Sequence, residues 1–213
     1  MTTKLKICGI TRLEDARYAA AAGADYLGFV QYEASPRYVA ARHVREIADW
    51  VHGPQPVGVF VDATAEEINR IADEAGFAFV QLHGDEPIFE VARVERPVIK
   101  ALRVAPETSP EMLRRRLREY EDVADYFMLD THSEQLRGGT GVPFDWDVAR
   151  GLSDDYEVFL AGGIGAGNVE ACVRAVHPFA VDVSSSLESA PGVKDFSRID
   201  AFMNSFEALR VGL

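Results

Sequence analysis

Short apolar runs rich in β-branched and aromatic residues recur along the chain, and each is followed by an amphipathic stretch. Runs of this length and composition predict buried strands, whereas apolar positions three and four residues apart predict helices. Eight strands are expected, at spacings of roughly 20 to 30 residues. They span residues 4–8, 25–30, 56–61, 78–83, 97–102, 125–130, 156–161 and 179–184.

The stretches between the predicted strands carry helix start and stop signals. Thr11 and Thr64 each stand three residues before a glutamate, which is the spacing of a capping box. Ser109 precedes a proline, the arrangement of an N-cap residue before the first helical turn. Gly23 and Gly76 follow two of the helical stretches, and each is expected to end its helix in the left-handed conformation.

This alternation of strands and helices implies parallel pairing through right-handed crossovers. Eight such units in 213 residues favour a closed (β/α)₈ barrel, an α/β fold, over an open doubly wound sheet. The open sheet is the rival, weakened because CGIT at residues 8–11 replaces the GxGxxG expected after its first strand. No linker or change in composition divides the chain, so residues 1–213 are expected to form one catalytic domain.

Charge and composition narrow the class of partner. The chain has 34 acidic and 22 basic residues, with a formal net charge of -12. Nucleic acids and anionic membranes bind basic faces, so neither is an expected partner, although a small anion can bind at a local positive site. No apolar run approaches the length of a membrane span, and the N-terminal residues 1–10 lack the long apolar core of a signal peptide. The two cysteines, Cys8 and Cys172, form no CxxC pair, and a reduced, cytoplasmic protein is expected.

Active sites of (β/α)₈ barrels lie at the C-terminal ends of the strands. The last two predicted strands carry the clearest signal there, because Gly162-Gly163 follows one and Ser184-Ser185 follows the other. Backbone N–H groups exposed at two such turns bind phosphate, and loops after strands 7 and 8 are the usual place. The alternative is a pair of plain βα turns, and their occurrence on adjacent strands favours phosphate.

Other polar residues at strand ends each have a structural alternative. Cys8 is either a small core residue or a thiol facing the site, and Asp130 is either a catalytic acid or a loop residue. Arg37 is suited to binding a carboxylate with two parallel hydrogen bonds, but lone arginines are commonly solvated. His83 is either an acid–base or hydrogen-bonding group or a packed histidine. Cys172 falls on helical spacing with three valines and is expected in the core.

A long loop follows Asp130 and contains Gly138-Gly139-Thr140-Gly141. Loops of this length in compact domains are usually either functional or disordered. This one has the glycine content to close over a ligand, with a plain surface excursion as the alternative. Gly139 and Gly141 are therefore candidates for lining the site.

In their order, the motifs resemble those of the phosphoribosylanthranilate isomerases of tryptophan biosynthesis. The resemblance covers nearly the whole chain, and the order and spacing of the motifs make it specific. It implies a (β/α)₈ barrel and an Amadori rearrangement of N-(5-phosphoribosyl)anthranilate, without cofactor or metal. The motifs are KICGIT (6–11), GADYLGFV (23–30), SPRYV (35–39), VGVFV (57–61), VQLHG (80–84), LDT (129–131), GGTGVPFDW (138–146), LAGG (160–163), NV (168–169), VDVSS (181–185) and PGVKD (191–195).

Carried over motif by motif, the resemblance implies a role for several residues. The general base matches Cys8, the general acid matches Asp130, and the carboxylate-binding arginine matches Arg37. The sequence departs from the family at Ser186, where glycine is common and a side chain resists positive φ. The phosphate-binding residues match Gly162, Gly163, Ser184 and Ser185, and the other expected site-lining residues are His83, Asp182, Gly139 and Gly141.

Strand alternation predicts one contact beneath this site. Lys6 and Cys8 point to the same side of the first strand, as do Asp182 and Ser184 on the last. These strands are neighbours in a closed barrel, so Lys6 and Asp182 are expected to form a buried ion pair. The alternative is that Lys6 extends out of the barrel's bottom. A free thiol is mostly protonated at pH 7, so what favours a Cys8 thiolate beside a phosphate is open.

Three other functions are weighed against the isomerase. A pentose-phosphate epimerase is expected to need a metal and a His/Asp set, whereas only five histidines occur and one is clearly at a strand end. The next enzyme of the same pathway is expected to carry a lysine where Cys8 stands. A non-catalytic phosphosugar-binding barrel is disfavoured by the presence of both Cys8 and Asp130. The expected partner is a small phosphorylated substrate, and the chain is expected to be a monomer or homodimer.

Overall fold

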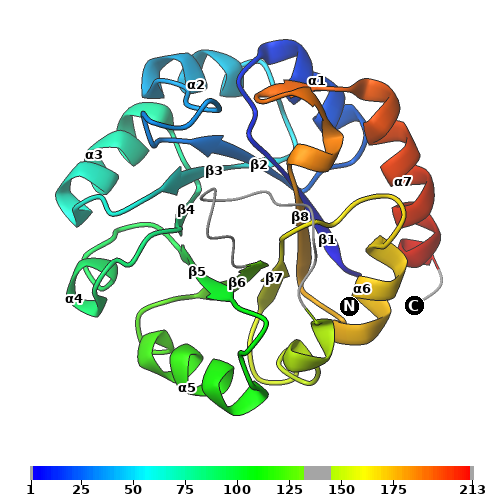
Figure 1. Cartoon of the computed structure of the whole chain (residues 1–213). Helices are drawn as coiled ribbons and strands as arrows, with labels where there is room; N and C mark the ends of the chain where they lie inside the picture. Colours follow the sequence, from blue (N-terminus) through cyan, green and yellow to red (C-terminus); the bar gives the residue numbers. More distant parts are fainter. Residues whose placement is uncertain (1, 132–144, 212–213) are drawn as a thin grey trace.

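A closed barrel of eight parallel strands forms the centre of the computed structural model, which describes residues 2–131 and 145–211 (Figure 1). The strands pair in chain order, and β8 closes on β1. Every strand lies within two residues of its predicted bounds, so the (β/α)₈ prediction is confirmed and the open sheet is excluded. The strands are β1 (Lys4–Cys8), β2 (Tyr26–Val30), β3 (Gln55–Phe60), β4 (Phe79–Leu82), β5 (Val98–Val104), β6 (Tyr126–Thr131), β7 (Val158–Leu160) and β8 (Ala180–Val183).

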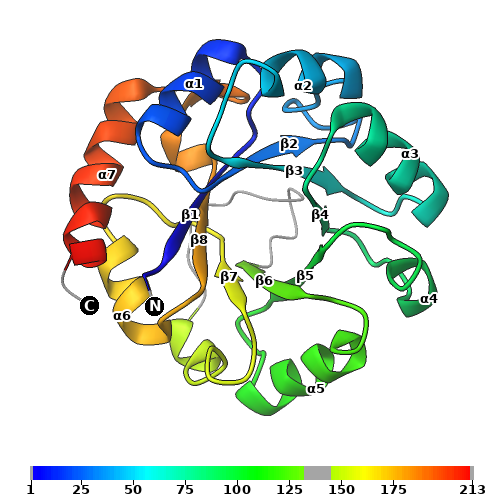
Figure 2. The same ribbon diagram turned by 180° about the vertical axis from the view of Figure 1, so that it is seen from behind.

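Helices surround the barrel, as the views from its two sides show (Figures 1 and 2). The last helix lies between the first and the sixth and contacts both. None of the helices in the described part of the chain has the length and apolar character needed to cross a membrane. The helices are α1 (Leu13–Ala21), α2 (Ala41–Ala48), α3 (Ala65–Ala75), α4 (Ile88–Val91), α5 (Pro110–Tyr120), α6 (Val169–Val176) and α7 (Phe196–Val211), with 3₁₀ turns η1 (Trp146–Ala149) and η2 (Ser185–Leu187) and a short antiparallel hairpin of β9 (Glu188–Ala190) and β10 (Val193–Lys194).

Four of the predicted helix signals are confirmed. The hydroxyl oxygen of Thr64 accepts a hydrogen bond from the backbone of the third helical residue at 3.3 Å, and that of Ser109 does the same at 3.2 Å. Gly76 ends α3 with a φ of 76°, and Gly23 follows α1 with a φ of 89°. Capping side chains satisfy N–H groups that have no partner within the helix, so the sequence marks these ends locally.

The prediction that Thr11 caps α1 is wrong. The N-cap residue is Arg12, one position later, and its side chain makes no capping hydrogen bond. The hydroxyl of Thr11 instead donates to the carbonyl oxygen of Gly192 at 2.6 Å. A tertiary contact between the segment before α1 and the β9–β10 hairpin therefore replaces the local cap.

Aromatic side chains fill the end of the barrel where the strands begin. The ring centroids of Tyr26 and Phe79 are 5.5 Å apart, and those of Phe79 and Tyr126 are 5.8 Å apart, both edge to face. Phe159 and Phe179 continue this layer at 5.4 Å from each other. Edge-to-face contacts at these distances are favourable for aromatic quadrupoles. The layer forms a floor beneath the more polar residues nearer the other end.

A second apolar layer lies between the strands and the helices. Leu5 and Ile7 of β1 are fully buried in it, together with Ala16 of α1 and Phe202 of α7. Alternate residues of a strand face opposite sides of the sheet, so the same five residues of β1 also send Lys6 and Cys8 inward. Burial of each large apolar side chain contributes about 1.5–3 kcal/mol, which fixes the strand register that positions the inward-facing residues.

Candidate active site

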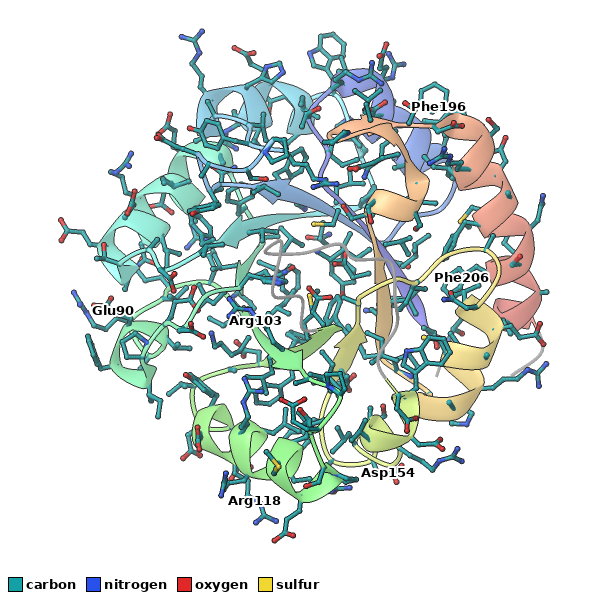
Figure 3. All side chains as sticks on the ribbon, in the orientation of Figure 1. Glu90, Arg103, Arg118, Asp154, Phe196 and Phe206 are labelled. Carbon is teal, nitrogen blue, oxygen red and sulfur yellow. The ribbon has the colours of Figure 1, made fainter. Side chains whose placement is uncertain are left out.

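The polar residues predicted for the site gather at the C-terminal ends of the strands. Cys8 is the last residue of β1, and Asp130 lies near the end of β6; they are 8% and 7% exposed. His83 follows β4 directly, and a further polar residue, Arg103, lies near the end of β5. Figure 3 shows Arg103 toward the middle of the barrel, whereas the labelled Arg118 lies on the outer ring of helices.

The predicted ion pair between Lys6 and Asp182 is confirmed. These two residues are register partners on β1 and β8, and Nζ of Lys6 lies 2.8 Å from Oδ1 of Asp182. The Lys6 side chain is fully buried, and its charge favours ionisation of the Cys8 thiol. Burial alone would lower the pKa of Lys6, but the neighbouring Asp182 and Cys8 raise it above its ordinary value. The lysine is therefore a fixed ammonium below the thiol.

The pKa of the Cys8 thiol is raised above its ordinary value. Burial is the largest cause and raises its pKa, and the Asp182 carboxylate raises it further. The ammonium groups of Lys6 and Lys194 oppose both effects, since they favour a thiolate, but they do not cancel them. At neutral pH the thiol is accordingly held mostly protonated, with two cations in place to stabilise the thiolate when it forms.

Gly28 of β2 makes room for the thiol. It is the register partner of Cys8, and a Cβ atom added at this position would lie 2.6 Å from the Cys8 sulfur. Real side chains do not approach so closely, so any larger residue would displace the sulfur. The glycine was visible within GADYLGFV, but its purpose depends on which residue it faces across the sheet.

His83 links the Asp130 carboxylate to a buried amide. Nε2 of His83 lies 3.1 Å from Oδ2 of Asp130, and Nδ1 lies 2.7 Å from Nε2 of Gln81. When the Gln81 amide donates to Nδ1, a neutral His83 carries its proton on Nε2 and donates to Asp130. Gln81 is 1% exposed and was not predicted, although it stands two residues before His83 and so shares its face of β4.

Arg37 does not extend freely into solvent. Its guanidinium forms a bidentate ion pair with the carboxylate of Glu188, and the shortest contact, from Nη2 to Oε2, is 2.7 Å. Lys194 lies 3.0 Å from the same carboxylate. The motif PGVKD contains this lysine, but a contact between residues 37 and 188 leaves no local signal in the sequence.

Two glycines with positive φ shape the turn after β7. Gly162 and Gly163 have φ values of 83° and 70°, which only glycine adopts without strain. The side chain of Asn168 fixes the turn, because its Nδ2 donates to the carbonyl of Gly163 at 2.9 Å and its Oδ1 accepts from the backbone of Gly165 at 2.8 Å. The N-cap residue of α6 thus orders the preceding loop rather than the helix end.

Ser186 joins this turn to the one after β8. Its hydroxyl donates to the carbonyl oxygen of Ile164 at 2.7 Å. Among the described residues, only Asp62 and His177 are non-glycine residues with positive φ, so the departure from the family at Ser186 introduces no left-handed strain. Ser184 and Ser185 precede and begin the η2 turn at the end of β8. The two turns are adjacent, as phosphate binding requires, and their role stays a prediction.

The remaining predicted residues divide into two groups. Cys172 is fully buried in α6, and burial raises the pKa of its thiol to about 12, which confirms its expected place in the core. Gly139 and Gly141 lie outside the described residues. Over residues 2–131 and 145–211, no cluster of three or more His, Cys, Asp or Glu side chains is arranged to bind a metal ion.

A closed parallel barrel with a thiol, an imidazole, a carboxylate and an arginine at its C-terminal end defines a (β/α)₈-barrel enzyme. Comparisons with known proteins specify it further. Residues 5–205 match the family model described as N-(5'phosphoribosyl)anthranilate (PRA) isomerase. The N-(5'-phosphoribosyl)anthranilate isomerase of Pelobacter propionicus is 47% identical over 204 residues, covering 94% of this chain and 93% of that protein. The chain belongs to the N-(5'-phosphoribosyl)anthranilate isomerase family, which confirms the resemblance seen in its motifs.

Solved structures agree with this assignment. The phosphoribosyl anthranilate isomerase of Thermus thermophilus is 37% identical, with a TM-score of 0.86, over 97% of this chain and all of that one. A phosphoribosyl anthranilate isomerase in complex with reduced 1-(o-carboxyphenylamino)-1-deoxyribulose 5-phosphate is 36% identical, with a TM-score of 0.84 and 97% and 100% coverage. The fold and the sequence therefore lead to the same family.

Proposed function

We propose that the chain converts N-(5'-phosphoribosyl)anthranilate into 1-(2-carboxyphenylamino)-1-deoxyribulose 5-phosphate, a step of tryptophan biosynthesis. The observation that carries the proposal is the position of Cys8 and Asp130, the residues that match the family's base and acid. Both side chains are largely buried at the C-terminal ends of strands of one barrel. The related structure that contains a reduced form of this product supports the same substrate class.

Asp130 is the proposed acid for opening the ribose ring. Its carboxyl group donates a proton to the ring oxygen while the lone pair of the anilino nitrogen expels that oxygen from C1. The products of this step are a hydroxyl group at C4 and an iminium ion between C1 and nitrogen. His83, 3.1 Å from Asp130, orients the carboxyl group for the transfer. Positioned acids of this kind contribute about 10²- to 10⁴-fold in rate.

Cys8 is the proposed base for the second step. The thiolate removes the proton from C2, and the electrons of that bond neutralise the iminium to give an enolamine. Protonation at C1 and loss of the hydroxyl proton at C2 then yield the ketone. Because burial raises the pKa of Cys8, the ammonium groups of Lys6 and Lys194 are needed to stabilise the thiolate.

Anionic groups at the two ends of the substrate provide its orientation. The guanidinium of Arg37 is proposed to bind the anthranilate carboxylate, because charge-assisted pairs of this geometry are strong and directional. The turns at Gly162-Gly163 and Ser184-Ser185 are proposed to bind the phosphate through backbone N–H groups, next to the N-terminus of α6. Both contacts hold the ribose between Cys8 and Asp130.

Loss of phosphoribosylanthranilate fluorescence tests the proposal directly. We expect Cys8→Ser and Asp130→Asn each to lower kcat by at least about 10²-fold while the circular dichroism spectrum is retained. Cys172→Ser is the matched control, because this buried thiol lies in the helical layer and should leave kcat unchanged. An inactive wild type would reject the function, and near wild-type turnover of either site variant would reject that residue's role.

The proposal also covers the domain organisation, the cellular location and the oligomeric state of the protein. We propose one catalytic domain over residues 1–213, because the eight strands from Lys4 to Val183 close a single barrel. We also propose a cytoplasmic enzyme that is a monomer or a homodimer. Light scattering coupled to size-exclusion chromatography distinguishes the two, since the chain mass is 23.5 kDa.

A further inference from the structure

One buried carboxylate, that of Glu188, pairs with two cations of the site, Arg37 and Lys194. Glu188 is 5% exposed and begins β9 directly after the η2 turn. Its oxygens accept hydrogen bonds from Nε and Nη2 of Arg37 at 2.7 to 3.1 Å. Oε1 also accepts from Nζ of Lys194 at 3.0 Å. Two cations from distant parts of the chain therefore share one anion.

Lys194 connects this carboxylate to the ends of two barrel strands. Its Nζ donates to the carbonyl oxygen of Cys8 at 2.6 Å and to that of Ser184 at 3.3 Å. Its backbone N–H donates to the buried carboxylate of Asp15 in α1 at 3.2 Å. The lysine side chain is fully buried, so these bonds fix it relative to β1 and β8. Glu188 is held, in turn, by a lysine that cannot move independently of the barrel.

The backbone around Glu188 is fixed independently of its carboxylate. A guanidinium N–H of Arg198, from α7, donates to the carbonyl oxygen of Glu188. On the opposite side, Gly9 leaves the space that the ion pair occupies. A Cβ atom at Gly9 would lie 2.8 Å from Cδ of Arg37 and 3.2 Å from Oε1 of Glu188. The turn after β1 thus accommodates the pair by carrying no side chain.

The pair leaves one edge of the guanidinium available. Arginine has five N–H donors, and Glu188 takes those on the Nε–Nη2 edge. Within residues 2–131 and 145–211, all side-chain hydrogen bonds of Arg37 go to Glu188. Nη1 and the second N–H of Nη2 form the adjacent edge, and a carboxylate can bind there with two parallel bonds. The Arg37 side chain is 22% exposed, so a ligand can reach it.

The charges of the cluster also favour an incoming anion. Burial would raise the pKa of Glu188, but the hydrogen bonds from Arg37 and the charge of Lys194 lower it below its usual value. The carboxylate is therefore ionised at neutral pH, and the protonated forms of Arg37 and Lys194 leave one positive charge in excess, although burial lowers the pKa of Lys194. A substrate carboxylate would balance this charge in a largely buried setting, on a protein whose net charge is otherwise -12.

We propose that Glu188, held in place by Lys194, is a positioning residue that turns the free edge of Arg37 toward the carboxylate on the substrate's aromatic ring. It touches no substrate atom and acts through Arg37. Without it, the long arginine side chain would sample several rotamers, and a substrate carboxylate would have to order it on binding. Glu188 therefore contributes to recognition of the aromatic acid rather than to the rearrangement itself.

Because this inference rests on the function proposed above, two substrates are compared. The first is phosphoribosylanthranilate, and the second is the analogue formed from ribose 5-phosphate and aniline, which lacks the carboxylate. For Glu188→Gln we expect KM for the first substrate to rise by about tenfold or more, with kcat within about threefold of wild type. For the analogue, both parameters should stay within about twofold. In an Arg37→Leu background, Glu188→Gln should change neither KM further.

Glu86→Gln is the matched control, because Glu86 is also a buried carboxylate paired with a buried lysine, Lys100, at 2.6 Å. Glu86→Gln should change KM for the two substrates by equal factors. If Glu188→Gln fails to fold, the double variant Glu188→Gln/Lys194→Met removes both charges of the pair. It should show the same difference in KM between the two substrates, with kcat lowered equally for both because Lys194 also favours the Cys8 thiolate. The inference would be overturned if Glu188→Gln changed KM for both substrates equally, or if its effect on KM were additive with that of Arg37→Leu. A wild type inactive on phosphoribosylanthranilate would instead reject the proposed function.

Discussion

Asp182 is predicted to hold the Cys8 thiol in its protonated form, so Asp182→Asn should favour the thiolate. The carboxylate pairs with the Lys6 ammonium, whose charge also acts on the Cys8 thiol. Replacing it by an amide removes a negative charge that opposes ionisation of Cys8. Lys6 would then have the thiolate as its nearest anionic partner. The expected result is a fall in the pKa of Cys8.

The size of this fall follows from the geometry. Asp182 is the register partner of Lys6, two residues before Cys8 on β1, so the two anions are roughly 6 Å apart. At an effective dielectric constant of about 20, their repulsion is about 3 kcal/mol. Solvent at the C-terminal end of the barrel reduces this energy, which is therefore an upper limit on the effect that lowers the pKa of Cys8.

Ultraviolet absorbance of the thiolate, recorded against pH in a Cys172→Ser background, measures the effect. Burial raises the pKa of Cys172 to about 12, so its removal eliminates only a signal at the alkaline limit. Lys6→Met is the opposite perturbation and should raise the pKa of Cys8, because it removes the closest cation. An unchanged or higher pKa in Asp182→Asn would refute the electrostatic reasoning.

The same pair of proteins gives a stability test. The pKa of Cys8 is raised in the folded chain, so this thiol's contribution is complete below its unfolded pKa of about 8.5 and is lost as pH rises through its folded pKa. The free energy of unfolding of the wild type should therefore fall with pH above about 8.5. In Asp182→Asn this fall should be smaller, because the folded and unfolded pKa values lie closer together. Urea unfolding across this range measures the difference, and an equal slope in both proteins would contradict it.

Two further predictions concern local geometry. Gly28→Ala places a Cβ atom 2.6 Å from the Cys8 sulfur, so kcat should fall by about tenfold or more, whereas Gly167→Ala, whose Cβ would meet nothing within 4 Å, should fold normally and retain kcat. A Gly28→Ala protein with wild-type kcat would show that the sulfur need not hold its position. Ser109→Ala removes the cap of α5 and should lower the free energy of unfolding by about 1 kcal/mol without altering kcat, as thermal unfolding and the fluorescence assay would detect. A stability equal to wild type would mean that solvent satisfies the helix end equally well.

The barrel was predictable because its strands are specified locally. Each strand is a short run of β-branched and aromatic residues, and the turns that follow carry glycine or capping residues. Alternation within β1 and β8, together with closure of the barrel, was sufficient to place Lys6 beside Asp182. Such a contact needs only the strand period and the strand order.

The parts that were not predicted depend on contacts between distant segments. Glu188 and Lys194 lie in a hairpin whose strands have three and two residues, too short for any periodic pattern. The pairing of Arg37 with Glu188 spans 151 positions in sequence. Thr11 had the spacing of a cap, but a tertiary hydrogen bond to the same hairpin took its hydroxyl. Local patterns do not encode which side chain a hairpin will bring back to the site.

The aromatic layer at the start of the strands determines from which end of the barrel solvent and substrate reach the site. Rings from Tyr26, Phe79, Tyr126, Phe159 and Phe179 occupy the end where the strands begin. Among the described residues, these rings close that end of the barrel to ions and water, so substrate, product and protons reach Cys8 from the C-terminal ends of the strands. A ligand seated there stops the supply of solvent to the thiol by its own presence.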